Sequence, residues 1–293
     1  MQGTVAQIVA LVVHGNTYFR GAEQAAAFPG DHSTLTFCEF VKFVGLTRSG
    51  ENWSETLFAQ DPASWLEELR ESGVYAIRMI YMPRGQNLSG ATDRMRVGFV
   101  GGGGRWLLET TGSNGSDYWE GRWEVGDQSR ADKKIWRVTY GRIAANQPPS
   151  PHAASDLQSL RQRLTKNLTD IAAFAHRQKL DGFANAFEAG LSDLASSSPD
   201  ADLHHNDLLT ADMPLTAAQL LSAAQSSWVF GGMGSWNDLG FDDDDQKTYE
   251  DLSEDLYKLL NDSIVSATNS TALLAAARLQ LKPQKRSWWR FWA

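Results

Sequence analysis

The sequence predicts an α+β protein: an N-terminal antiparallel β-sheet with one or two covering helices, followed by an α-helical C-terminal domain. Apolar residues alternate with a period of two before residue 146 and recur at helical spacing after residue 152. Between the patterns lie Pro148, Pro149 and Pro151, and proline continues neither a helix nor a β-ladder. The length of 293 residues and the apolar content of 42% suffice for two cores. We therefore expect domains at 1–146 and 152–282, then a tail at 283–293.

The first third of the chain predicts four elements. The apolar run Val5–Val13 is expected to be a buried helix or strand, because it lacks the charged flank and cleavage site of a signal peptide. Leu35–Val44 predicts a buried strand. Asp61–Arg70 predicts a short helix, with Asp61 before a proline at the first helical position. Val74–Met82 predicts a second strand.

The next segments predict an antiparallel meander. Arg94–Val100 and Arg105–Thr110 flank Gly101–Gly104, a pattern that indicates two strands joined by a hairpin turn. Tyr118–Val125 and Lys134–Ile143 alternate as two further strands. One face of this sheet is expected to be buried and the other to carry charge. The buried face comprises Trp119, Trp123, Trp136, Val138 and Tyr140, and the charged face includes Glu120, Glu124 and Arg137.

After the prolines, apolar stripes at spacings of three and four predict at least four helices. Capping boxes at Ser155–Gln158 and Thr216–Gln219 predict where two of them begin. Asp242–Asp245 precedes another helix, where carboxylates favour the positive end of the helix dipole. Leu273–Leu281 predicts a fifth helix or an extension of the fourth.

Composition excludes some functions and predicts no cofactor. A net charge of −8 argues against general nucleic-acid binding, which usually needs a basic face. The one cysteine, Cys38, lies in an apolar run, so we expect a buried structural thiol and no intrachain disulfide. No apolar stretch reaches membrane-spanning length, so we expect a cytoplasmic protein.

The most unusual segment is residues 228–241, here called the Gly/Trp loop, where four glycines lie among large aromatic residues. Ordered glycine costs backbone entropy, so such a segment is expected to need positive φ angles or close backbone approach. One interpretation is a polar binding site lined by Trp228, Ser235, Trp236, Asn237 and Asp238. The other is a tight connection whose tryptophans fill the core.

Three other motifs are weaker. Gly101–Gly104 is not expected to bind phosphate, because a strand and not a helix follows it. His204–Asp207 lacks the ligand spacing of a metal site, so we expect a solvated loop. Asp242–Asp245 lacks the alternation of a calcium loop. The sequence therefore predicts no metal site.

The C-terminal tail is basic and aromatic on an otherwise acidic chain. Its basic residues are Lys282, Lys285, Arg286 and Arg290, and they alternate with Trp288, Trp289, Phe291 and Trp292. Such a cluster predicts a binding event. The tail could contact an anionic membrane peripherally, insert into a groove of another protein, or pack on its own acidic body.

Without a catalytic constellation, the sequence favours a non-catalytic protein-binding protein of bacterial type: an adaptor, an immunity-type inhibitor or an assembly component. The alternative is a hydrolase with its site in the interdomain cleft near the Gly/Trp loop. An enzyme predicts a deep pocket with converging polar groups, whereas a binding protein predicts a broad surface patch.

Overall fold

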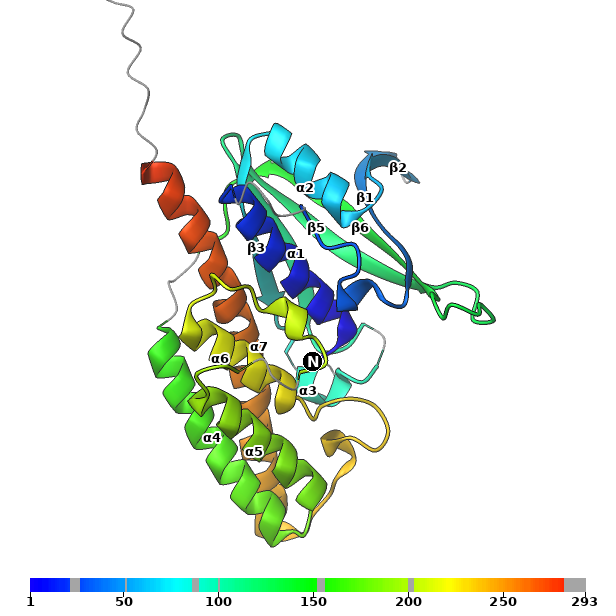
Figure 1. Cartoon of the computed structure of the whole chain (residues 1–293). Helices are drawn as coiled ribbons and strands as arrows, with labels where there is room; N and C mark the ends of the chain where they lie inside the picture. The colour runs from blue at the N-terminus through cyan, green and yellow to red at the C-terminus, as the bar shows by residue number, and fades with distance from the viewer. Residues whose placement is uncertain are drawn as a thin grey trace, which may run out of the picture.

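The computed structural model describes residues 1–21, 27–50, 52–85, 90–99, 101–151, 156–199 and 203–281. The N-terminal half forms a six-stranded sheet with helices, and the C-terminal half is helical, as Figure 1 shows. The expected α+β fold class is confirmed.

The sheet consists of β1 (Cys38–Ser49), β2 (Asn52–Ala59), β3 (Val74–Met82), β4 (Arg105–Gly112), β5 (Gly115–Val125) and β6 (Trp136–Gln147), in the order β2-β1-β6-β5-β4-β3. The antiparallel meander is confirmed over β4 to β6, and β3 takes the place that was expected for Arg94–Val100 beside β4. Two features were not predicted: β2 itself, and the parallel pairing of β1 with β6, which makes the sheet mixed.

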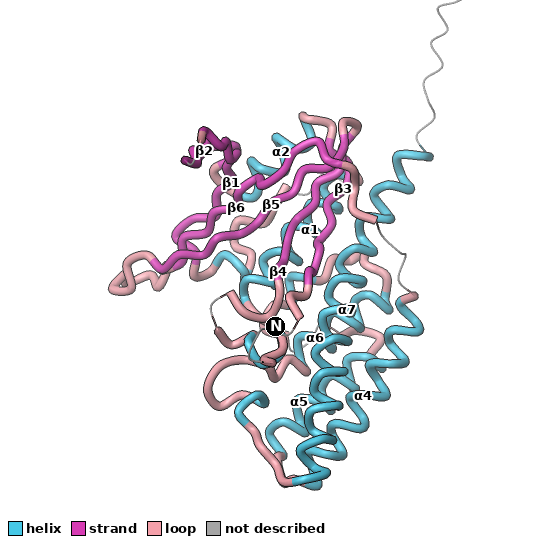
Figure 2. Tube along the Cα trace, turned by 180° about the vertical axis from the view of Figure 1, so that it is seen from behind, coloured by secondary structure: helices cyan, strands magenta, loops and turns pink. Residues whose placement is uncertain are grey.

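Two helices, α1 (Gly3–Phe19) and α2 (Pro62–Glu71), cover one face of the sheet (Figure 1). The helix at α2 was expected, and Val5–Val13, expected as either a helix or a strand, is a helix. Asp61 caps α2 by accepting the N–H of Ser64 at 2.8 Å. Phe43 lies at the centre of this face, stacked between Trp65 and Tyr140 with ring centroids 4.3 and 5.2 Å away. The predicted alternation holds, although Trp123 and Trp136 are only half-buried. No described helix covers the opposite face, which Figure 2 shows.

The predicted strand at Arg94–Val100 and its hairpin turn are wrong. This segment forms α3 (Asp93–Arg96), a single turn capped by the hydroxyl of Thr92, followed by a loop. A Cβ atom on Gly102 would lie 1.7 Å from the carbonyl oxygen of Arg96, and Gly101, Gly103 and Gly104 have positive φ. The glycines therefore fold the chain back on α3 and do not join two strands.

The helical half contains α4 (Leu157–Arg177), α5 (Asp181–Ala195), α6 (Leu215–Ser226) and α7 (Asp243–Leu281). Asp156 caps α4 through the N–H groups of Gln158 and Ser159, while Ser155 lies outside the described residues. The capping box at Thr216 is wrong, because α6 begins at Leu215 after Pro214. Leu273–Leu281 continues α7, and the first turn of α7 carries the expected aspartates.

The long α7 joins the two halves along the outer edge of β3. The amide of Asn269 accepts the N–H of Met79 at 2.8 Å and donates to its carbonyl at 2.9 Å. Asn16 on α1 makes the same pair of bonds to Ile77, at 2.9 and 2.8 Å. Buried residues from both halves belong to one apolar cluster. Separate folding of 1–146 and 152–282 stays a prediction.

Candidate functional site

Trp236 of the Gly/Trp loop fills the core of the helical half. Its side chain is fully buried, with the rings of Phe183 and Phe187 each 5.1 Å from its own, centroid to centroid. Its indole N–H donates to Ser253 Oγ at 2.7 Å, so its one polar atom is satisfied inside the protein. Trp236 therefore offers nothing to a ligand.

The polar residues of the loop are engaged in holding its own backbone. Ser235 Oγ donates to the carbonyl of Gly231 at 3.1 Å and accepts the N–H of Asn237 at 3.3 Å, capping the 3-10 turn η3 (Trp236–Asp238). The carboxylate of Asp238 accepts the N–H of Gly234. Gly234 has φ of +84°, so the expected positive φ is confirmed.

Asn237 ties the loop to the sheet half. Its Nδ2 donates to the carbonyl of Arg94 at 2.9 Å, and Arg94 Nη1 donates back to Asn237 Oδ1 at 3.1 Å. The guanidinium of Arg94 is buried and also donates to Glu254 Oε1 at 2.8 Å. A Cβ on Gly98 would lie 2.3 Å from the carbonyl oxygen of Gly231, so the two glycine-rich segments touch through bare backbone. The Gly/Trp loop therefore connects the sheet half to the helical half through hydrogen bonds and close backbone contact.

The remaining predicted site residues belong to two segments, the Gly/Trp loop and the C-terminal tail. Trp228 is half-buried and donates its indole N–H to the carbonyl of Phe230 at 2.9 Å. The tail residues Trp288, Trp289, Arg290 and Trp292 lie outside the described residues. The structure thus brings the predicted loop residues together, but each of their side chains makes a hydrogen bond within the protein.

His205 and Asp207 do not lie in a solvated loop, which corrects the expectation for His204–Asp207. Asp207, on the 3-10 turn η2 (Asn206–Leu208), binds Ser33 through both the backbone N–H and the hydroxyl, each at 2.6 Å. His205 Nδ1 also lies 2.6 Å from Ser33 Oγ. The ring Nε2 atoms of His14 and His32 lie 3.0 and 3.2 Å from the carbonyl oxygen of Asp207. We call these five residues the histidine–aspartate cluster.

The histidine–aspartate cluster resembles a catalytic triad only in composition. In a triad the carboxylate orients the histidine, and the histidine receives the serine proton. Here Asp207 accepts the Ser33 hydroxyl directly, and its Ser33 bonds hold the pKa of Asp207 below its usual value despite burial. Burial lowers the pKa of His32 and of His205 to about 4. The arrangement fastens α1 to η2 with neutral histidines.

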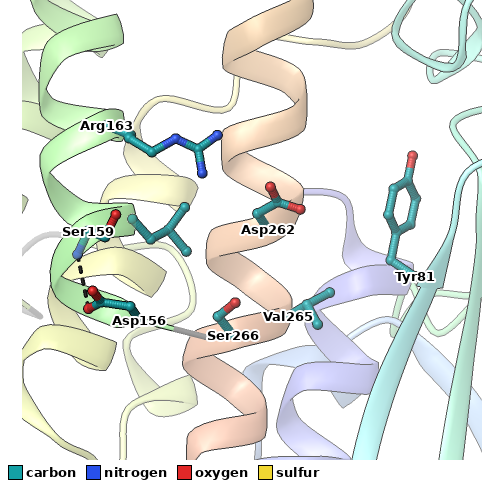
Figure 3. Close-up of a pocket in the computed structure, with 8 residues that line it drawn as sticks. Tyr81, Asp156, Ser159, Arg163, Asp262, Val265 and Ser266 are labelled. Atoms are coloured by element: carbon teal, nitrogen blue, oxygen red, sulfur yellow. Dashed lines mark hydrogen bonds between the residues drawn. The ribbon is translucent and has the colours of Figure 1, made fainter. Parts of the chain in front are cut away.

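A cleft of about 410 Å³ lies between α4, α7 and β3, as Figure 3 shows. Burial raises the pKa of Asp262, while the charges of Arg163 and Lys258 oppose the change. Asp156 is already used in capping α4. Neither serine among the described lining residues has a histidine or lysine beside it there, so these residues form no nucleophile–base pair. Its lining residues are Tyr81, Asp156, Ser159, Leu160, Arg163, Asp262, Val265 and Ser266.

The face of the sheet that no described helix covers ends at β2, an edge strand whose side chains are mostly exposed. Trp53 and Leu57 are 60% and 56% exposed, and β1 pairing puts them on the same face as Glu55. We call Trp53, Glu55 and Leu57 the β2 edge surface. A hollow of about 280 Å³ beside it is lined in part by Leu46 and Ile143. The sequence patterns did not indicate this surface, because they predicted no strand over the residues of β2.

Comparisons with known proteins give no family for this chain. No family model, no curated protein and no solved structure matches it. Within the described residues, no cluster of histidine, cysteine, aspartate or glutamate side chains could hold a metal ion. Across the same residues, no helix combines the length and apolarity that a membrane span requires.

Proposed function

We propose that this protein is a non-catalytic protein-binding protein, such as an adaptor, an immunity-type inhibitor or an assembly component. The observation that carries the proposal is the β2 edge surface. It combines a strand edge that pairs with no further strand among the described residues and two large, exposed apolar side chains, and such edges recruit other polypeptides. The basic-aromatic tail is proposed as a second contact with partner proteins.

The geometry supports binding better than the alternative, a hydrolase near the Gly/Trp loop. A hydrolase there would need Ser235, Asn237 or Asp238 free to face a substrate, yet each is bonded to the protein backbone. The cleft of Figure 3 lies elsewhere, and its described lining residues supply a carboxylate and a guanidinium but no nucleophile–base pair. A cytoplasmic location remains part of the proposal.

Affinity capture from the organism that encodes the protein tests this function. The bait is the full chain, compared with Trp53→Ser/Leu57→Ser and with Met233→Ser. Met233 is a fitting control because it is fully exposed and belongs to the Gly/Trp loop. We expect one partner to be captured by the wild type and the control but lost with the double variant. Equal capture by all three, or loss only with Met233→Ser, would contradict the proposal.

A further inference from the structure

We propose that the β2 edge surface receives the C-terminal tail of a second copy of this chain, added as an extra β-strand. This inference rests on the proposed protein-binding function and specifies one partner. It uses two parts of the molecule that the fold leaves unexplained, the uncovered edge of β2 and the basic-aromatic segment after Pro283.

The two edges of the sheet are treated differently. At the β3 edge, Asn16 and Asn269 each bond both the N–H and the carbonyl of one strand residue, so Ile77 and Met79 cannot pair with another strand. At the β2 edge no described element takes that place, and the strand lies at the end of the sheet order. An uncovered edge carries main-chain donors and acceptors that suit an extended peptide.

The side chains of β2 and of the tail are complementary. Residues two apart in a strand share a face, so β2 presents an aromatic, an acidic and an aliphatic residue in the order Trp53, Glu55, Leu57. An extended tail would present Trp288, Arg290 and Trp292 in the same way. With Arg290 opposite Glu55, both tryptophans face apolar residues in either strand direction. Opposite-charge and aromatic cross-strand pairs are the ones that stabilise sheets.

Charge favours the tail over other extended segments of this chain. Residues 282–293 carry four basic residues and no acidic one, so the net charge of −8 becomes −12 for residues 1–281 (−8 minus 4). Glu55 contacts Arg122 at 3.0 Å through Oε1 and is 34% exposed. A pairing of two β2 strands centred on Glu55 would instead place two carboxylates opposite one another, which is destabilising.

The tail must come from another molecule because of distance. Six strand spacings separate β3 from a strand added outside β2, about 29 Å at the usual 4.8 Å each. Asn269 fixes α7 against β3, and Figures 1 and 2 show the end of α7 on the β3 side of the sheet. Seven Cα–Cα steps lead from Leu281 to Trp288, and they span at most about 25 Å when extended. Reciprocal exchange between two copies closes a symmetric dimer.

A charge-swap experiment tests the inference on the full chain. Sedimentation velocity over a range of concentrations measures self-association of the wild type, Glu55→Arg, Arg290→Glu, and an equimolar mixture of these two variants. We expect dimers of the wild type and an increase of about five- to tenfold in Kd for each variant alone. The mixture should regain association, because the tail of the Arg290→Glu chain then matches β2 of the Glu55→Arg chain. The control is Glu124→Arg, which changes an exposed glutamate of β5 that also contacts Arg122 and should leave the sedimenting mass unchanged.

Several outcomes would overturn the inference. A wild type that is monomeric throughout, association insensitive to both charge reversals, or a mixture that fails to recover would each do so. Tail-dependent binding to vesicles of anionic phospholipid by both wild type and Glu55→Arg would assign the tail to membranes instead. If the host partner is still captured through Trp53 and Leu57 while self-association is absent, the proposed function stands and only this inference fails.

Discussion

The hydrogen bonds that the side-chain amide of Asn16 makes to the edge of β3 contribute strongly to the free energy of unfolding. The Asn16 side chain makes three hydrogen bonds, to the N–H and carbonyl of Ile77 and to Thr271 Oγ1, at 2.8 to 2.9 Å. A hydrogen bond contributes roughly 1 kcal/mol, and a buried polar group left without one costs roughly 1–3 kcal/mol. Asn16→Ala is therefore expected to lower the free energy of unfolding by about 3–4 kcal/mol. Asn269→Ala, at a partly buried site with two bonds, is expected to cost about 2 kcal/mol.

Urea unfolding followed by tryptophan fluorescence measures both values. Gln128→Ala, in the exposed β5–β6 loop, is the control and should stay within about 0.5 kcal/mol of wild type. Hydrogen exchange adds a local readout, because the Met79 amide should exchange faster in Asn269→Ala. A loss below about 1 kcal/mol for Asn16→Ala would refute the reasoning that side-chain amides satisfy this edge.

Other predictions address the cluster and the loop. His32 and His205 have folded pKa values near 4, below the unfolded value of 6.5, so the unfolded chain binds more protons. The contribution of these neutral histidines to the free energy of unfolding is therefore fully present above pH 6.5, and it falls by about 1–2 kcal/mol per histidine toward pH 4. Urea midpoints that do not change over this range would contradict this prediction. Trp236→Ala should cost about 3–5 kcal/mol in the same assay, and a loss under 1 kcal/mol would mean the ring is not a core residue. Gly98→Val should also lower the free energy of unfolding, because the backbone of Gly231 leaves no room for a side chain there. An unchanged stability would contradict this backbone contact. Asp238→Asn should keep host-partner capture unchanged, and loss of capture without loss of stability would restore the loop as a binding site.

Local signals in the sequence predicted elements well. Asp61 and Pro62 mark the start of α2, the apolar run Val74–Met82 gave both bounds of β3, and alternation placed most of β5 at Tyr118–Val125. Arg94–Val100 alternates too, but its conformation depends on Gly98 meeting Gly231, more than 130 residues away. No local pattern reports such a contact.

The candidate site was harder to predict because its parts are distant in sequence. The histidine–aspartate cluster joins residues 14, 32 and 33 to residues 205 and 207. The β2 edge surface depends on strand order, which alternation along one segment does not determine. The Gly/Trp loop was correctly identified as a special backbone, and its two interpretations differed only in which partners its side chains find.

Hydrogen–deuterium exchange on the complex captured from the host, compared with the free chain, tests the central claim most directly. If the β2 edge binds proteins while the Gly/Trp loop joins the two halves, amides of Asn52–Ala59 gain protection in the complex. Amides of residues 228–241 then exchange at the same rate in both samples. Protection gained in residues 228–241 with none in β2 would contradict the claim.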